Sequence, residues 1–241
     1  MICYDEYGKD NDEIIIFLPG AGVLDTFYHY YYLEKEYRLI VPHLPGTGEN
    51  ASVIYDPKKT TDELIKLIES FNTKVGIIGH SLGGQLVLRL LDKRQDLFKY
   101  AIILSAEVTV DKKIIKLYTS LSKAQTSLMK IDWLIKIQCA YWGFPHGVAV
   151  KMCKYLKNTT ADVYASFFER MLDINELNYQ NISVPMLAIC GKSELRSMKE
   201  SLKLLGKNKN CKTLMIKGNH DFVMRKHQYL SIIISEYIKE F

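Results

Sequence analysis

A serine lies between two glycines at a point where the hydrophobic pattern of the chain changes its period. Residues 79–83 read GHSLG, which is the spacing G-x-S-x-G. β-Branched apolar residues precede this segment and leucines at intervals of four follow it, a pattern typical of a buried strand followed by a helix with one buried face. Glycines at this spacing permit a tight turn that raises the serine hydroxyl above the sheet. The pattern therefore predicts a nucleophile at Ser81.

A serine hydroxyl is a weak nucleophile and needs a base, an acid that orients the base, and donors for the developing oxyanion. His220 and two acids, Glu194 and Glu107, each follow a predicted strand closely. Because the carboxyl ends of parallel strands meet at one edge of a sheet, these side chains are expected near Ser81. Glu194 is favoured as the acid because its strand is nearest in sequence to that of His220, and Glu107 stays open as the alternative. The backbone N–H of Leu82, at the start of the new helix, is expected to donate to the oxyanion.

The elements that must position these residues alternate between strands and helices. Apolar runs predict strands at residues 13–18, 37–41, 74–79, 99–105, 185–190 and 212–217. Helical patterns lie between them, for example at 61–71, where Thr60 and Glu63 have capping-box spacing. This alternation predicts an α/β fold with a mainly parallel sheet and helices on both faces. Residues 111–181 break the alternation, because they contain only helical patterns.

With these residues in place, the chain resembles the α/β-hydrolase family over nearly all of its length. The order Ser81, acid, His220 is the order of that family. The resemblance implies a core of residues 1–110 and 182–241 and a helical cap inserted at residues 111–181. It also implies a mainly parallel sheet flanked by helices.

The resemblance further implies a role for each site residue. Ser81 would be the nucleophile, His220 the general base and Glu194 the acid, while the N–H groups of Ala21 and Leu82 would form the oxyanion hole. Pro19 stands where the family usually has a histidine in the oxyanion loop. Four further residues are expected to contact substrate: Gly20, His80, Trp133 and Trp142.

These assignments predict a serine hydrolase that cleaves a small-to-medium ester, thioester or amide through an acyl-enzyme. No metal or organic cofactor is required by this chemistry. The same three residues also serve acyltransferases and C–C bond hydrolases, and the fold is compatible with a non-catalytic ligand-binding protein. An active-site serine probe separates the last alternative from the enzymes.

Composition narrows the class of protein. The 241 residues are 48% hydrophobic and 24% charged, as expected for an ordinary globular protein. The sequence predicts a cytoplasmic protein without stable membrane insertion. Its five cysteines are scattered, its N-terminus lacks the basic region of a signal peptide, and no apolar run reaches the length of a membrane span. The oligomeric state stays open.

The charge is unevenly distributed. The net charge is +5, and residues 112–157 hold nine lysines, no arginine and one acid. Because the lysines alternate with apolar residues at helical spacing, they are interpreted as solvated outer faces of helices. Nucleic acid is therefore not expected as a partner, and the expected ligand is a small acyl compound.

Overall fold

The computed structural model describes residues 2–110 and 112–241. Met1 and Asp111, the first residues of the predicted core and of the predicted insertion, lie outside the described residues.

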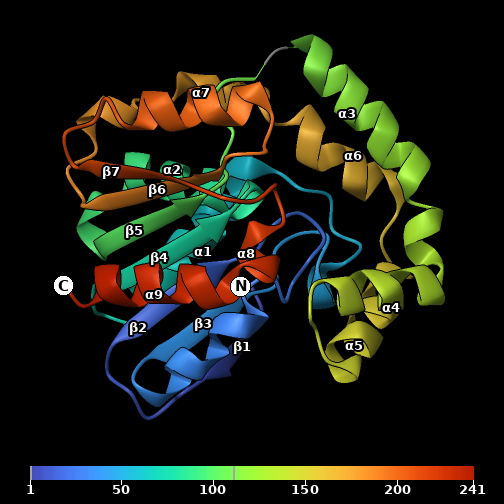
Figure 1. Ribbon diagram of the computed structural model, residues 1–241, viewed down its shortest axis with the longest axis horizontal. Helices are drawn as coiled ribbons and strands as arrows, with labels where there is room; N and C mark the ends of the chain where they lie inside the picture. The colour runs from blue at the N-terminus through green and yellow to red at the C-terminus, as the bar shows by residue number, and fades with distance from the viewer. Residues whose placement is uncertain (1, 111) are drawn as a thin grey trace.

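A seven-stranded sheet forms the centre of the molecule (Figure 1). Its strands are β1 (Tyr4–Tyr7), β2 (Ile14–Leu18), β3 (Arg38–Pro42), β4 (Val75–His80), β5 (Phe98–Leu104), β6 (Met186–Gly191) and β7 (Cys211–Ile216). Their spatial order is β1-β3-β2-β4-β5-β6-β7, and every neighbouring pair is parallel except β1 with β3. The fold class predicted from sequence is thus confirmed, and the six predicted strands agree with the observed ones to within one residue at each end.

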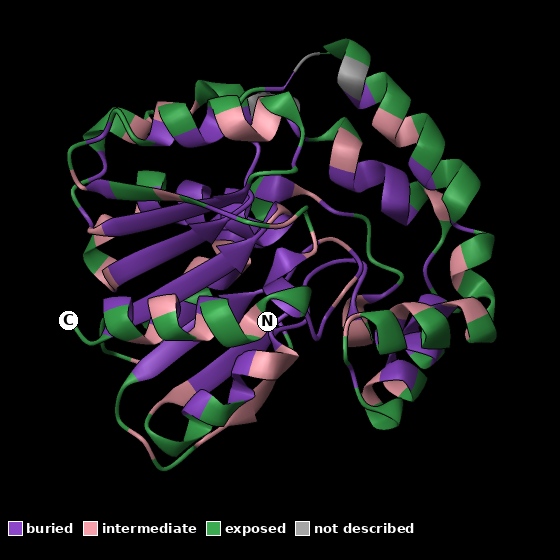
Figure 2. Ribbon diagram, in the orientation of Figure 1, coloured by how far each residue is buried: buried purple, intermediate pink, exposed green. Residues whose placement is uncertain are grey.

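The strand β1 is absent from the prediction because its sequence, Tyr-Asp-Glu-Tyr, lacks an apolar run. All of its residues are half-buried, and the strand forms one edge of the sheet, where one side is open to solvent. By contrast, β2 and β4 are buried along their whole length. Figure 2 shows the strands as the buried centre of the molecule.

Helices cover both faces of the sheet, with α9 in front of it and α1 and α2 behind it in Figure 1. The α-helices of the described residues are α1 (Pro57–Glu69), α2 (Leu82–Lys93), α3 (Lys112–Gln125), α4 (Asp132–Tyr141), α5 (His146–Leu156), α6 (Ala161–Glu169), α7 (Arg196–Leu205), α8 (Phe222–Arg225) and α9 (His227–Ile238). Short 3₁₀ turns are η1 (Tyr28–Lys35), η2 (Gly48–Asn50), η3 (Gln95–Leu97), η4 (Leu128–Lys130), η5 (Leu172–Glu176) and η6 (Tyr179–Asn181). Within the part of the chain that the structure describes, no helix is both long and apolar enough to cross a membrane.

The first helix begins earlier than its sequence pattern predicts. The helix α1 starts at Pro57, and the side chain of Asp56 caps it by accepting a hydrogen bond of 2.9 Å from the Lys59 N–H. The predicted capping box at Thr60 is therefore wrong, since Thr60 lies buried inside the helix. Aspartate followed by proline is an equally good start signal, because proline at the first helical position loses no hydrogen bond.

The segment between β5 and β6 contains α3 to α6 and, among its described residues, no strand. Helix α3 packs on α6, and α4 packs on α5. These helices lie beside the carboxyl ends of the strands (Figure 1). The insertion is thereby placed next to the residues that follow β4, β6 and β7.

Candidate active site

The turn that carries Ser81 has a strained backbone. Ser81 lies between the end of β4 and the start of α2, with φ 54° and ψ −115°. The neighbouring glycines make this turn possible: a Cβ on Gly83 would lie 2.0 Å from the Leu18 carbonyl oxygen, and one on Gly79 would lie 2.3 Å from the Gly83 carbonyl oxygen. Positive φ in a residue other than glycine is costly and is concentrated at functional sites.

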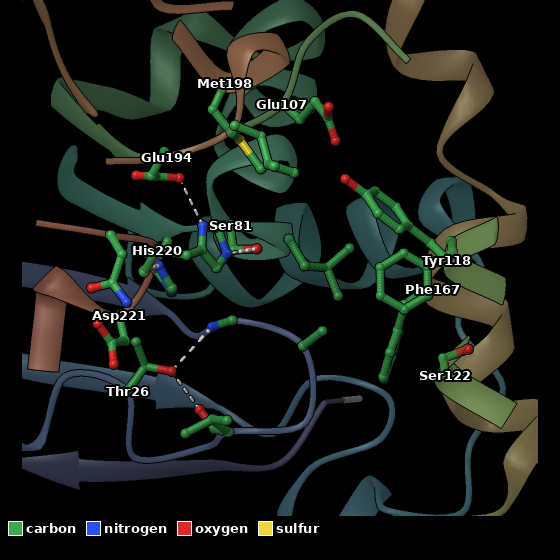
Figure 3. Close-up of a pocket in the computed structure, with 18 of the residues that line it drawn as sticks. Thr26, Ser81, Glu107, Tyr118, Ser122, Phe167, Glu194, Met198, His220 and Asp221 are labelled. Carbon is green, nitrogen blue, oxygen red and sulfur yellow. Dashed lines mark hydrogen bonds and ion pairs between the residues drawn. The ribbon is translucent and has the colours of Figure 1, made fainter. Parts of the chain in front are cut away.

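Three side chains from three strand ends form one hydrogen-bonded chain (Figure 3). The Ser81 Oγ lies 2.9 Å from His220 Nε2, and His220 Nδ1 lies 2.9 Å from Glu194 Oε2. With the carboxylate accepting from Nδ1–H, the free Nε2 lone pair accepts the serine proton. This is the tautomer that a general base requires.

The carboxylate of Glu194 is held on both of its oxygens. Its side chain is 2% exposed, and Oε1 accepts a hydrogen bond of 2.9 Å from the Gly191 N–H and another from the Ser105 hydroxyl. Burial alone would raise the pKa of Glu194, but the hydrogen bonds from His220, Ser105 and Gly191 hold it below its usual value. Glu194 is therefore ionised near neutral pH and fixed opposite the imidazole.

Ser105 is the last residue of a predicted strand but is not among the predicted site residues. It is the residue after β5, it is buried, and it has a positive φ of 50°. One feature of the sequence points to Ser105: it lies at the end of a predicted strand, on the edge of the sheet where the candidate catalytic residues are expected.

The second candidate acid, Glu107, does not contact His220. Glu107 also follows β5 and is buried, but neither of its carboxyl oxygens has a hydrogen-bond partner among the described residues. Of the two acids left open by the sequence, the geometry brings only Glu194 to the imidazole.

The loop after β2 lies against the elbow, the turn of residues 79–83 that carries Ser81, and is held by hydrogen bonds among its own residues. The Thr26 hydroxyl accepts a hydrogen bond of 3.2 Å from the Gly20 N–H and donates one of 2.6 Å to the Val23 carbonyl oxygen. Gly20 and Ala21 line the same cavity as Ser81 and Leu82. The structure thus places both predicted oxyanion residues beside the serine.

His80 is buried beneath the site. Its Nε2–H donates a hydrogen bond of 2.9 Å to the backbone oxygen of His220. Burial, with a contribution from the neighbouring His220, lowers the pKa of His80 to about 3. A neutral His80 therefore positions the segment that carries His220 and is unsuited to act as a base.

A cavity of about 710 Å³ opens above Ser81. Its walls come from the sheet core and from the insertion, including Tyr118, Trp142 and Phe167. The predicted contact residues Gly20, His80 and Trp142 line it. Trp133 does not, because it is 61% exposed on the outer face of α4, so its predicted place in the pocket is wrong.

Helix periodicity could not identify which faces of the insertion point inward. Tyr118 and Phe167 line the cavity but were not singled out from sequence. Their place in the cavity wall depends on how α3 packs on α6. An aromatic side chain by itself is equally consistent with a place in the core and a place in a pocket.

Two other histidines form a separate pair. His29 and His227 stack with ring centroids 3.9 Å apart, and His29 Nε2–H donates a hydrogen bond of 2.8 Å to the Trp142 carbonyl oxygen. This pair joins the core to the insertion, and neither ring lines the cavity.

Solved structures share the fold at low sequence identity. A thermophilic esterase from Thermogutta terrifontis is 16% identical, with a TM-score of 0.74 over 99% of this chain and 93% of that chain. An enol-lactonase from Burkholderia xenovorans LB400 is 15% identical, with a TM-score of 0.76 over 99% and 96% of the two chains. A carboxylesterase structure from the thaumarchaeon Nitrososphaera gargenis is 15% identical, with a TM-score of 0.76 over 99% and 94%.

The curated proteins contain no match to this sequence. The sequence model of the alpha/beta hydrolase family matches residues 15–200, a range that spans β2, the elbow, the insertion and β6. The protein is therefore an enzyme of the alpha/beta hydrolase family.

Proposed function

We propose that the protein hydrolyses carboxylic esters of small-to-medium size through an acyl-enzyme on Ser81. The observation that carries this proposal is the unbroken hydrogen-bonded chain from Ser81 through His220 to Glu194. An elbow strained at the serine and a cavity above it support the same function.

The geometry gives each residue of the site a defined role in the reaction. His220 Nε2 takes the proton as the Ser81 Oγ attacks the ester carbonyl, and the ionised Glu194 stabilises the imidazolium that forms. The N–H groups of Ala21 and Leu82 hold the oxyanion, and the second of these lies at the positive N-terminus of α2. His220 then protonates the leaving alcohol, and a water activated by the same imidazole releases the acid.

The insertion, residues 111–181, acts in this proposal as a cap. Its described helices supply much of the cavity wall, including aromatic side chains that can pack against the methylene chain of an acyl group. Its role is to exclude water from the carbonyl during attack and to set which acyl groups fit.

A cytoplasmic site of action is part of the proposal. All five cysteines are free, and four of them are buried. Unpaired cysteines are typical of reducing compartments.

The test is a series of p-nitrophenyl esters of increasing acyl length, combined with labelling by a fluorophosphonate serine probe. Wild type should release p-nitrophenol and take up the probe, and Ser81→Ala should do neither. Ser52→Ala is the matched control, because Ser52 is exposed and lies outside the cavity. Retention of hydrolysis or of labelling by Ser81→Ala would refute the proposal.

A further inference from the structure

The charges on the cavity wall are all of one sign. The described residues that line it include three carboxylates, Glu107, Glu194 and Asp221, and no lysine or arginine. This contrasts with the insertion, whose residues 112–157 carry nine lysines. No fixed positive side chain of the described wall is therefore available to bind an anionic group of a substrate.

Glu107 is the buried carboxyl group of this wall whose oxygens form no hydrogen bond within the described part of the chain. Glu194 accepts hydrogen bonds from Ser105, Gly191 and His220. Neither oxygen of Glu107 has a partner in hydrogen-bond geometry among the described residues, although the Ser197 hydroxyl lies nearby. Glu107 is 2% exposed. A buried carboxyl group without a hydrogen bond destabilises the fold. Either the fold bears this cost, or a ligand supplies the missing hydrogen bonds when it binds.

The main chain holds Glu107 rigidly in this position. The Gln85 side-chain amide donates a hydrogen bond of 2.7 Å to the Glu107 carbonyl oxygen, and the Val108 N–H donates one of 2.9 Å to the Ser201 hydroxyl. Backbone anchors on both sides of the Cα leave the carboxyl pre-positioned, which reduces the entropic cost of binding a ligand.

Aromatic rings face the same space. Tyr118 of α3 and Phe168 of α6 both line the cavity, with ring centroids 5.5 Å apart. Figure 3 shows the Tyr118 hydroxyl pointing toward the carboxyl group of Glu107. Carboxylate and phenolic oxygens accept hydrogen bonds from an ammonium group, and aromatic rings that face the same space also attract cations.

We propose that Glu107 and Tyr118 form a subsite for a positively charged group on the substrate, so that the preferred esters carry an ammonium group on the acyl chain. This inference rests on the proposed esterase function and names its substrate class. The ammonium group donates hydrogen bonds to the Glu107 oxygens, and the ester carbonyl lies at Ser81. Acyl groups that end in a carboxylate are disfavoured, because the described cavity wall holds three carboxyl groups and no lysine or arginine.

Three p-nitrophenyl esters with the same five-methylene chain test the subsite: 6-aminohexanoate, heptanoate and the monoester of heptanedioate. Their chain ends are cationic, neutral and anionic. In wild type, kcat/KM for the cationic ester should exceed that for the neutral ester by roughly tenfold or more, since hydrogen bonds between charged groups are strong. The anionic ester should be the poorest.

The variant Glu107→Gln keeps the shape of the side chain and removes its charge. Its ratio of kcat/KM between cationic and neutral esters should fall toward one. Glu236→Gln, on the exposed face of α9, is the matched control and should keep the wild-type ratio. An unchanged ratio in Glu107→Gln, or a wild-type preference for the anionic ester, would overturn the subsite.

A pH profile of the wild-type ratio gives a readout that does not depend on the folding of a variant. Burial raises the pKa of Glu107, partly offset by the nearby Ser197 hydroxyl and by His220. The titratable groups that interact with it are Tyr118, His220 and Glu194. Because only the ionised carboxylate attracts the cation, the ratio should fall as pH is lowered through the pKa of Glu107.

Failure of the esterase function is distinguishable from failure of the subsite. Calorimetric titration of Ser81→Ala with methyl 6-aminohexanoate and methyl heptanoate measures binding without turnover. Tighter binding of the cationic ester supports the subsite even if wild type hydrolyses neither. Equal binding refutes the subsite, and it does so even if every ester is hydrolysed in a Ser81-dependent way.

Discussion

At the scale of single residues, the environment of Glu194 decides which of two acids orients the imidazole. The Ser105 hydroxyl and the Gly191 N–H donate to its carboxylate, whereas no donor of the described residues lies in hydrogen-bond geometry with Glu107. The sequence places both acids at strand ends and gives no means to separate them, because the deciding contacts come from Ser105 and Gly191. The order of the strands along the chain could identify both acids as candidates. The packing of the loops after the strands is needed to identify which acid contacts His220.

The substitution Glu194→Gln tests this assignment. Loss of the charge removes stabilisation of the imidazolium and favours the wrong tautomer, so kcat should fall by about 10²- to 10⁴-fold for every ester. Glu107→Gln should instead change the ranking of cationic and neutral esters. A general loss of kcat in Glu107→Gln with little loss in Glu194→Gln would reverse the two roles.

Protonation of His80 should destabilise the fold in acid. The pKa of His80 falls from 6.5 to about 3 on folding, so the unfolded chain binds the extra proton more readily. Its contribution to stability is complete above pH 6.5 and is lost as pH falls toward 3, on the order of 1 kcal/mol per pH unit.

Urea unfolding at pH 7, 6 and 5 measures this effect of His80. The difference in unfolding free energy between wild type and His80→Gln should shrink as pH falls. His146→Gln is the control, because His146 is exposed at the start of α5. A difference that stays constant with pH in His80→Gln would contradict the account.

At the scale of elements, the strands were predictable because most of them are buried and apolar. The exception, β1, is a half-buried edge strand with two acidic residues, and no hydrophobic pattern marks it. Helix α1 shows a different limit. Its sequence holds two start signals within about one turn, Asp56-Pro57 and the Thr60–Glu63 spacing. The helix starts at the first signal, Asp56-Pro57, because Thr60 packs into the core.

The cap of α1 gives an element-scale prediction. Asp56→Ala should lower the unfolding free energy by about 1 kcal/mol, because it leaves the Lys59 N–H without its acceptor. Asp56→Asn retains an acceptor oxygen and should lose much less. Equal stability of the alanine and wild-type proteins in urea unfolding would show that the helix starts elsewhere.

At the scale of the whole molecule, the excess of positive charge lies outside the cavity. Eight of the nine lysines between residues 112 and 157 are exposed, and Lys151 is half-buried against Asp5 and Asp25. None of these lysines lines the cavity. The sequence interpretation of solvated helix faces agrees with this placement, although sequence alone could not show that the wall itself is acidic.

This charge distribution predicts weak salt dependence. Replacing Lys112, Lys113 and Lys116 together by glutamine should change kcat/KM for neutral esters by less than about twofold, and raising salt should have a similarly small effect. Electrostatic steering would make the rate fall steeply with ionic strength. A strong salt-dependent preference for anionic esters that disappears in the triple variant would contradict this view.

The central claim is that Ser81 and His220 act as one unit, and a double-mutant cycle on kcat/KM tests it most directly. Ser81→Ala and His220→Ala should each lower kcat/KM for a p-nitrophenyl ester by about 10⁴-fold or more, because either change removes the activated nucleophile. The double variant should be little worse than either single variant. Losses that multiply in the double variant, or near-wild-type turnover in either single variant, would contradict the account.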